Sequence, residues 1–189
     1  MVAENPNIVI ILADDLGYTD VGCYGAVKIK TPNIDRLAKE GMRFTDAHSP
    51  AAVCSPSRYG LLTGQYPFRN PAFASGFLLP AEPLGIGLEQ PTIGTLAKSQ
   101  GYTTGVVGKW HIGIGMPPQA DYNGEMKGVP PDVGFDESFI DPCNLATSIF
   151  IEGRKVVNAD LKDPFRWEQP KVGRNLVLKG GAKARIATK

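Results

Sequence analysis

Apolar runs alternate with capped amphipathic segments along the first two thirds of the chain. Residues 7–13 form a continuous, β-branched apolar run, which is typical of a central parallel strand covered on both faces. Residues 102–108 indicate a further strand, and residues 42–47 indicate a shorter one. Helix signals lie between these runs, so the order of elements predicts an α/β fold. We expect a mostly parallel central sheet with helices on both faces.

Two segments carry the start and stop signals of short helices. Residues 31–41 begin with a capping threonine followed by proline, and they end at a glycine. Residues 91–101 have the same design, with Thr92 as the expected cap. The apolar side chains of the first helix that we expect to face inward are Ile34, Leu37 and Ala38.

The rest of the chain is rich in turns. Glycine and proline number 22 and 16 of the 189 residues, which predicts a loop-rich body. Residues 65–90 predict a long loop of the kind that is often functional, and residues 114–137 predict another loop. Residues 148–157 indicate a hairpin. We expect one domain over residues 1–157 and a basic, poorly ordered tail over residues 158–189.

Charge is nearly balanced along the chain. Lysine and arginine number 20 against 19 acidic residues, and this net charge of +1 does not favour a nucleic-acid or membrane-surface partner. No apolar stretch approaches the ~18–20 residues needed to span a bilayer. The first residues lack the basic and apolar regions of a signal peptide. A periplasmic or secreted location is therefore expected only if a leader is removed, and a cytoplasmic one otherwise.

The three cysteines, Cys23, Cys54 and Cys143, are too few for a disulfide framework. If Cys54 is consumed by modification, Cys23 and Cys143 remain and could pair. Buried free thiols are the favoured alternative for these two, because free cysteine commonly serves as a small apolar side chain.

Chemically active side chains cluster at expected strand ends and at one helix start. Asp14 and Asp15 follow the first apolar run and are hard oxygen ligands suited to Ca²⁺ or Mg²⁺, although an acidic pair also commonly forms a turn or a cap. Cys54 opens a third helix, with Ser55 as its expected cap and Gly64 just past its end. The cationic or proton-donating candidates are Arg58, Lys109 and His111. A metal, a nucleophile and cations together favour transfer of an anionic tetrahedral group, phosphate or sulfate.

The helix that opens at Cys54 carries the run C-x-P-S-R-x-x-x-L-T-G over residues 54–64, which resembles the signature of the type I sulfatases. Residues 101–113 are similar to the family's second signature, G-Y-x-T-x-x-x-G-K-W-H-x-G. Residues 7–17 and 31–37 resemble the opening strand of these enzymes and the helix that follows it. The resemblance implies that residues 1–157 are the N-terminal part of a sulfatase catalytic domain, in the alkaline phosphatase superfamily.

The resemblance also implies a metal cofactor and a modified residue. Asp14 and Asp15 would bind a divalent cation, usually Ca²⁺, with Mg²⁺ as the alternative. Cys54, oxidised to Cα-formylglycine by a formylglycine-generating enzyme, would complete the inner sphere of the metal through its hydrated aldehyde. One hydroxyl of that hydrate would attack sulfur, and deprotonation of the second hydroxyl would then expel sulfate and restore the aldehyde.

Further roles are implied for the polar residues around Cys54. Arg58 would hold the hydrate and neutralise charge, and Lys109 would contact the sulfate as a catalytic and substrate-binding residue. His111 would orient a formylglycine hydroxyl or assist its proton transfer, and Ser57 would support substrate binding by a hydrogen bond. The expected function is therefore an enzymatic one, hydrolysis of sulfate monoesters on a sulfated carbohydrate or an aryl sulfate.

The chain departs from the family pattern in one respect. The later Asp-Asn metal ligands, a further histidine and a second lysine of the family have no counterpart here, so we expect weak metal binding by this chain alone.

Two alternative functions remain open. One is a sulfatase-like piece without turnover that binds an anion or a partner, and the other is a phosphonate or phosphate ester hydrolase of the same superfamily.

Overall fold

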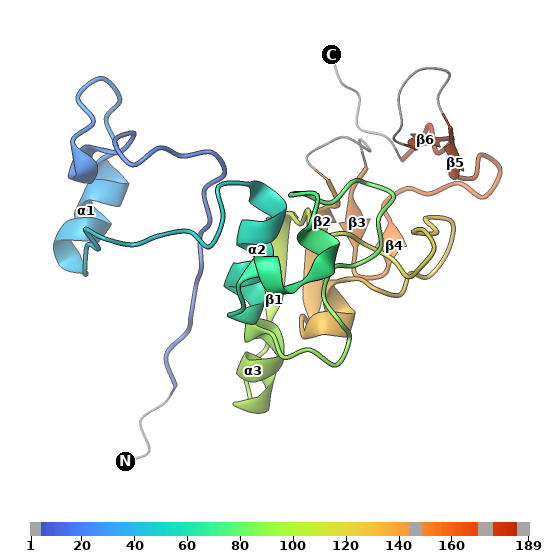
Figure 1. Ribbon diagram of the computed structural model, residues 1–189, viewed down its shortest axis with the longest axis horizontal. Helices are drawn as coiled ribbons and strands as arrows, with labels where there is room; N and C mark the ends of the chain where they lie inside the picture. Colours follow the sequence, from blue (N-terminus) through green and yellow to red (C-terminus); the bar gives the residue numbers. More distant parts are fainter. Residues whose placement is uncertain (1–4, 144–148, 170–175, 185–189) are drawn as a thin grey trace. The chain divides into compact units, whose positions relative to one another are not determined.

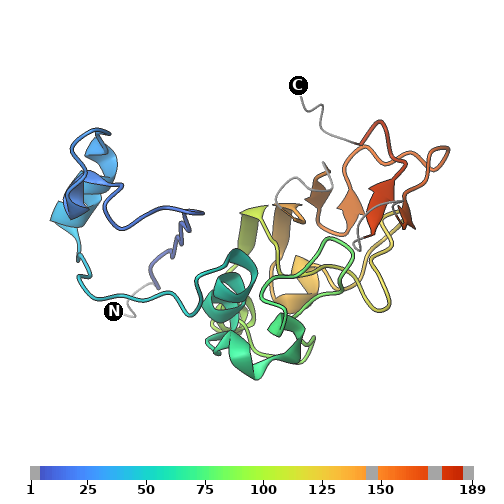
Figure 2. The ribbon, with the colours of Figure 1, turned by 45° about the horizontal axis from the view of Figure 1, so that its top comes forward.

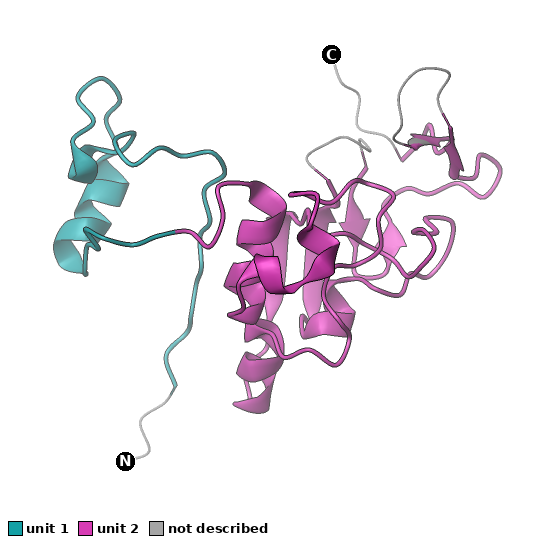
Figure 3. Ribbon diagram, viewed as in Figure 1, with its two compact units in different colours: residues 1–48 teal, residues 49–189 magenta. Residues whose placement is uncertain are grey.

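The computed structural model describes residues 5–143, 149–169 and 176–184. The chain divides into two compact units, residues 1–48 and residues 49–189, which Figure 3 colours separately. The second unit contains the strands and most of the buried apolar side chains of the described residues. The two units are described separately below.

A mixed sheet forms the centre of the second unit. Its strands are β1 (Gly105–Lys109), β2 (Glu137–Asp141), β3 (Ile151–Glu152) and β4 (Lys155–Val156), in the spatial order β1-β2-β3-β4. Strands β1 and β2 pair in parallel and lie side by side in Figures 1 and 2, whereas the other two pairings are antiparallel. The α/β class predicted from the sequence is confirmed, and the described strands contain one parallel pair.

Two of these strands form the predicted hairpin, and one strand was not predicted. Strands β3 and β4 join through Gly153, whose φ of 55° is the left-handed conformation that glycine adopts without strain. Residue 148, at the start of the predicted hairpin, lies outside the described residues. Strand β2 was not predicted from the sequence, because this short segment directly follows the proline-rich loop and resembles a continuation of it.

The two α-helices of the second unit precede its first strand in sequence. They are α2 (Cys54–Thr63) and α3 (Ile93–Ser99), and the short 3₁₀ helices are η2 (Pro67–Arg69), η3 (Pro71–Phe73) and η4 (Pro130–Val133). The cap predicted for α3 is confirmed: the Thr95 N–H donates to Thr92 Oγ1 at 3.1 Å, and the Thr92 N–H donates to Thr95 Oγ1 at 2.8 Å. Within the described ranges, no helix is both long enough and apolar enough to cross a membrane.

The long loop predicted over residues 65–90 is a packed part of the core. Its side chains Leu78 and Ile86 are buried together with Ile140 of the sheet. The turn that follows β1 contributes Ile112, which is fully buried. Because the loop packs its apolar side chains under the end of β1, its backbone is held next to the residues predicted to act chemically.

The end of the chain differs from the poorly ordered tail expected over residues 158–189. Strands β5 (Arg166–Glu168) and β6 (Val177–Lys179) pair antiparallel there. The Trp167 indole N–H donates to the Ala120 carbonyl at 2.9 Å, which ties β5 to the preceding loop. Residues 170–175 and 185–189 of the expected tail lie outside the described residues, and the domain boundary at residue 157 stays a prediction.

In the first unit, the structure contradicts two predicted strands. It contains η1 (Gly22–Tyr24) and α1 (Pro32–Glu40), and no strand is assigned in its described residues, 5–48. Residues 7–13 and 42–47 are therefore not strands here, and the side chains of residues 8–12 are 49 to 87% exposed. A strand exists only when a neighbouring backbone satisfies its hydrogen bonds, so an apolar run cannot form one by itself.

Helix α1 has the predicted boundaries and a different environment. It begins at Pro32 and ends before Gly41 as predicted, but Thr31 makes no side-chain capping bond to it. The predicted inward-facing residues Ile34 and Leu37 are nevertheless 46% and 69% exposed. The prediction of a buried face is wrong for this unit, because its only buried apolar side chain among residues 5–48 is Val21.

A carboxylate in the second unit connects α3 to the beginning of β1. Asp136 accepts hydrogen bonds from Lys98 Nζ at 2.6 Å and from the Thr104 N–H and hydroxyl, both at 2.9 Å. The bond from Lys98, followed by those from Thr104, lowers the pKa of Asp136 from its ordinary 3.8 to about 2. The charged carboxylate accepts these three bonds more strongly than the protonated acid does, so folding favours the deprotonated form.

We predict a pH-dependent loss of stability through Asp136. Its pKa is lower in the folded than in the unfolded chain, so its contribution is present above the ordinary value of 3.8 and is lost as the pH falls towards about 2. Replacing Asp136→Asn should remove this part of the dependence, measured by urea unfolding across that range. The exposed Glu89→Gln is the matched control for removal of one charge. Equal pH slopes in the wild type and in Asp136→Asn would contradict the prediction.

Candidate active site

Four of the predicted site residues meet where β1 ends and α2 begins. Cys54 is the first residue of α2, and its Sγ lies 3.2 Å from Nδ1 of His111. Arg58 stands one turn further along α2, on the same face as Cys54, and its guanidinium donates to the carbonyl of Lys109, the last residue of β1. The structure therefore brings Cys54, Arg58, Lys109 and His111 together within the second unit.

The start of α2 adds positive potential to this cluster. The first backbone N–H groups of a helix have no partner within the helix, and the helix dipole places partial positive charge at this end. Arg58 and Lys109 are both half-buried, and the Arg58 guanidinium contacts the backbone of Lys109. An arrangement of this kind suits an anion with several oxygens, because backbone and side-chain donors can point at it from different directions.

The turn after β1 holds His111 in an uncommon backbone conformation. Its φ of 52° lies in the left-handed region, and the side chain is 7% exposed. The Trp110 N–H donates to the Asp141 carbonyl at 2.9 Å, and the His111 N–H donates to the Pro142 carbonyl at 3.1 Å. The segment at the end of β2 thus fixes the turn, and a backbone held in a strained conformation is a feature of functional sites.

Ser55 does not have the predicted role of a helix cap. Helix α2 begins two residues earlier than expected, after Val53, and Val53 makes no side-chain capping bond. The Ser55 side chain is fully buried, and its Oγ accepts a hydrogen bond from the Leu78 N–H at 3.2 Å. The other end of the helix is as predicted, with Gly64 in the left-handed conformation at a φ of 67°.

Ser57 faces the loop that leads into α2. Its hydroxyl donates to the Ala51 carbonyl at 2.7 Å and lies 2.9 Å from Ser49 Oγ. These contacts support the segment immediately before Cys54. A direct contact of Ser57 with substrate stays a prediction.

The predicted metal ligands Asp14 and Asp15 belong to the first unit and are exposed. Asp15 has a left-handed backbone, with a φ of 56°. Two adjacent carboxylates have the donor chemistry that Ca²⁺ prefers, but Ca²⁺ takes six to eight oxygens. No group of three or more His, Cys, Asp or Glu side chains that could hold a metal occurs among the described residues. The metal site, with Cys54 as its third member, stays a prediction.

All three cysteines are free thiols. Cys143 is buried, and burial, followed by the nearby Asp141 charge, raises its pKa to about 11. Cys23 is only half-buried, so the expectation of a buried thiol holds for Cys143 and not for Cys23.

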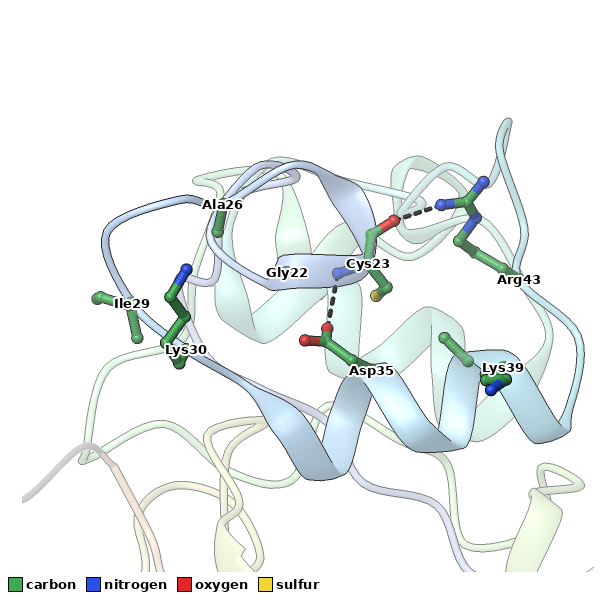
Figure 4. A pocket seen from close by; sticks show the side chains of 9 residues that line it. Gly22, Cys23, Ala26, Ile29, Lys30, Asp35, Lys39 and Arg43 are labelled. Carbon is green, nitrogen blue, oxygen red and sulfur yellow. Dashed lines mark hydrogen bonds between the residues drawn. The ribbon is translucent and has the colours of Figure 1, made fainter.

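Cys23 lines a pocket of the first unit, which Figure 4 shows. This pocket has a volume of about 630 Å³, and its basic lining residues are Lys30, Lys39 and Arg43. The Cys23 N–H donates to Asp35 Oδ1 at 2.6 Å across its floor. None of the predicted catalytic or metal-binding residues lines this pocket.

Comparison with known proteins identifies the family. The sulfatase family model matches residues 6–149, so the chain belongs to the sulfatase family of sulfuric ester hydrolases. The chain is 43% identical over 167 residues to N-acetylgalactosamine-6-O-sulfatase of Bacteroides thetaiotaomicron, covering 86% of this chain and 32% of that protein. It is 46% identical over 134 residues to arylsulfatase A of Homo sapiens, covering 71% of this chain and 25% of that protein.

A solved structure supports the same assignment of fold. A Bacteroides thetaiotaomicron sulfatase, described in connection with the metabolism of multiple glycosaminoglycans, superposes with a TM-score of 0.90 at 35% identity, over 98% of this chain and 45% of that one. The fold is therefore the α/β fold of the sulfatases, as the sequence predicted. The chain spans about a third or less of the length of the two curated relatives.

Gly113 provides a test of how rigidly the site turn is held. Its φ is 76°, and an added Cβ would lie 2.0 Å from the Pro83 carbonyl oxygen. We predict that Gly113→Ala lowers the free energy of unfolding by about 2–4 kcal/mol, since a backbone atom cannot move aside as a side-chain tip can. Urea unfolding measures this loss. Gly124→Ala, where a Cβ meets nothing within 4 Å, is the matched control and should change stability by less than about 1 kcal/mol. Similar losses in both variants would contradict the prediction.

Proposed function

We propose that this chain carries the nucleophile and the anion-binding residues of an enzyme that hydrolyses sulfate monoesters. The observation that carries the proposal is the contact of Cys54 with His111 at 3.2 Å, in which both residues belong to sulfatase signature runs. Cys54 and His111 are 57 positions apart in sequence, and the fold joins their two runs at one point. Membership of the sulfatase family supports the same reaction class.

The residues around Cys54 have separate roles in this proposal. Arg58 and Lys109 bind the oxygens of the sulfate and neutralise the charge that develops on them. The backbone donor at the start of α2 adds to this, because its partial positive charge faces the same place. His111 orients the nucleophile and accepts or returns its proton. Ser57 holds the segment before Cys54 in place through the Ala51 carbonyl.

In this proposal the nucleophile is a modified Cys54, and a divalent cation helps to neutralise the negative charge of the sulfate. Conversion of Cys54 to formylglycine by a formylglycine-generating enzyme supplies a hydrated aldehyde with two hydroxyls at this position, which a serine lacks. Asp14 and Asp15 are the carboxylates of this chain that would hold Ca²⁺, with Mg²⁺ as the alternative, and they provide fewer oxygens than either ion prefers. Weak binding by the chain alone follows from that number.

The substrate class that we propose is a sulfated carbohydrate. One relative is by name an N-acetylgalactosamine-6-O-sulfatase, and the solved structure with a TM-score of 0.90 is connected with glycosaminoglycans. A sugar sulfate presents a compact tetrahedral anion on a neutral polar body, which suits a site whose charged residues gather at one point. An aryl sulfate has the same reacting group and serves as a probe.

We predict that co-expression with a formylglycine-generating enzyme converts Cys54 in this chain. Tryptic cleavage gives the peptide of residues 44–58, in which mass spectrometry detects the replacement of the thiol by an aldehyde. The converted chain should hydrolyse 4-nitrophenyl sulfate with Ca²⁺, and Cys54→Ala should abolish this. Cys23→Ala removes the other half-buried thiol and should leave activity unchanged.

Two results would contradict this proposal and separate its alternatives. Conversion without turnover would indicate a sulfatase-like piece that at most binds an anion or a partner, an alternative favoured by the absence of a three-ligand metal group among the described residues. Faster turnover of 4-nitrophenyl phosphate than of the sulfate would indicate a phosphate or phosphonate ester hydrolase of the same superfamily.

We predict that the guanidinium of Arg58 cannot be replaced by an ammonium. In Arg58→Lys the charge remains, but the fork that also donates to the Lys109 carbonyl is lost. The kcat for 4-nitrophenyl sulfate should fall by about 10²-fold or more, the loss typical of removing one charge-stabilising donor. The exposed Arg36→Lys is the matched control. A kcat within about 2-fold of the wild type would show that charge alone is sufficient at this position.

A further inference from the structure

Ser55, Leu78 and His111 form a chain of buried hydrogen bonds that returns to Cys54. The Leu78 N–H donates to Ser55 Oγ at 3.2 Å, and the Leu78 carbonyl oxygen lies 3.1 Å from Nε2 of His111. Nδ1 on the other side of the imidazole lies 3.2 Å from Cys54 Sγ. Since Ser55 directly follows Cys54, the contacts close a ring through one serine, the backbone of one leucine and one imidazole.

The chemistry of these groups decides where the imidazole carries its proton. A carbonyl oxygen only accepts hydrogen bonds, so the nitrogen that faces Leu78 has to donate. A neutral imidazole has one N–H, and with the proton on Nε2 the lone pair is on Nδ1. Nδ1 is the nitrogen that faces Cys54. The Leu78 carbonyl therefore selects the tautomer in which the nitrogen next to residue 54 is a proton acceptor.

Burial makes this selection strong. Ser55 is fully buried, and Leu78 and His111 are 3% and 7% exposed, so water does not readily replace a missing partner. Removing Ser55 Oγ leaves the Leu78 N–H without its acceptor at a buried position, which favours displacement of the backbone at Leu78. The Leu78 carbonyl belongs to the next peptide unit, which is joined to the displaced one through the Leu78 Cα, so it would shift relative to His111.

We infer that Ser55 is a positioning residue: by holding the backbone at Leu78, it fixes His111 with its proton on Nε2 and its acceptor Nδ1 towards residue 54. The consequence for catalysis rests on the proposed function, because a formylglycine hydroxyl at position 54 would meet a proton acceptor and not a donor. The tautomer itself is a property of the chain and is measurable without turnover.

The chain is well suited to a direct measurement, since it contains two histidines. In ¹⁵N-labelled protein at about pH 8.5, two units above the ordinary histidine pKa of about 6.5, two-bond ¹H–¹⁵N correlations distinguish the two tautomers of a neutral ring. His48, whose side chain is 83% exposed, is assigned by His48→Gln and serves as an internal reference. We expect the wild-type His111 to carry its proton on Nε2 alone. A proton on Nδ1, or a mixture of tautomers, overturns the inference.

Variants then separate positioning from simple stabilisation. Ser55→Ala should give a mixture of His111 tautomers, and Ser55→Thr, which keeps the hydroxyl, should restore the Nε2–H form. Ser75→Ala, an exposed serine of the same loop, is the matched control and should not alter the spectrum. A role in stability alone predicts that Ser55→Ala lowers the urea midpoint with the tautomer unchanged, and that result overturns the inference. Should Ser55→Ala not fold, the wild-type spectrum and Ser55→Thr still decide.

The catalytic consequence is tested on the chain converted to formylglycine. Ser55→Ala should lower kcat for 4-nitrophenyl sulfate by about 10-fold or more, with little change in KM, and it should change the pH profile of kcat, because general acid–base catalysis depends on the protonation state of the ring. If the wild type has no turnover and His111 is in the Nε2–H form, the proposed function fails and the positioning of the ring stands. If the wild type turns over and Ser55→Ala has the same kcat and pH profile, the positioning role fails and the proposed function stands.

Discussion

The contact between the turn after β1 and the first residues of α2 is the interaction on which the candidate site depends. In this contact Cys54 Sγ lies 3.2 Å from His111 Nδ1, and the Arg58 guanidinium donates to the Lys109 carbonyl. These two contacts hold the end of the strand next to the start of the helix. A strand end offers polar side chains at the edge of the sheet, and a helix start offers unpaired donors and partial positive charge. Neither feature binds an anion strongly alone, and their junction combines both.

The loop of residues 65–90 keeps this junction in place. It has almost no regular secondary structure, yet its apolar side chains are part of the core and its backbone groups are used as specific partners. The Leu78 N–H contacts Ser55 and the Leu78 carbonyl contacts His111, and the Gly85 N–H donates to the Ile112 carbonyl at 2.8 Å. The loop is thus a support for the site, built from main-chain groups that satisfy each other away from water.

Sequence signals predicted the structure correctly where it depends on interactions between residues close together in the chain. The capping pair Thr92 and Thr95, and the left-handed Gly64 after α2, depend on bonds to neighbours within a few residues, and the structure has both. The apolar run over residues 7–13 has an equally strong pattern and forms no strand in the described first unit. Strand formation depends on a partner backbone that is distant in sequence. An apolar pattern indicates that a segment is favoured to be buried, but it does not identify the segment that would cover it or pair with it.

The sequence by itself determined the residue types of the site and the family to which they belong. The runs around Cys54 and around Lys109 and His111 carry that information, because a nucleophile, cations and glycine turns in fixed order are chemically specific. Only the tertiary structure decided that Ser55 contacts the backbone of Leu78 and that this carbonyl faces His111. A main-chain carbonyl is the same in every residue, so no sequence pattern marks the one that will be used. Its role follows from where the chain places it.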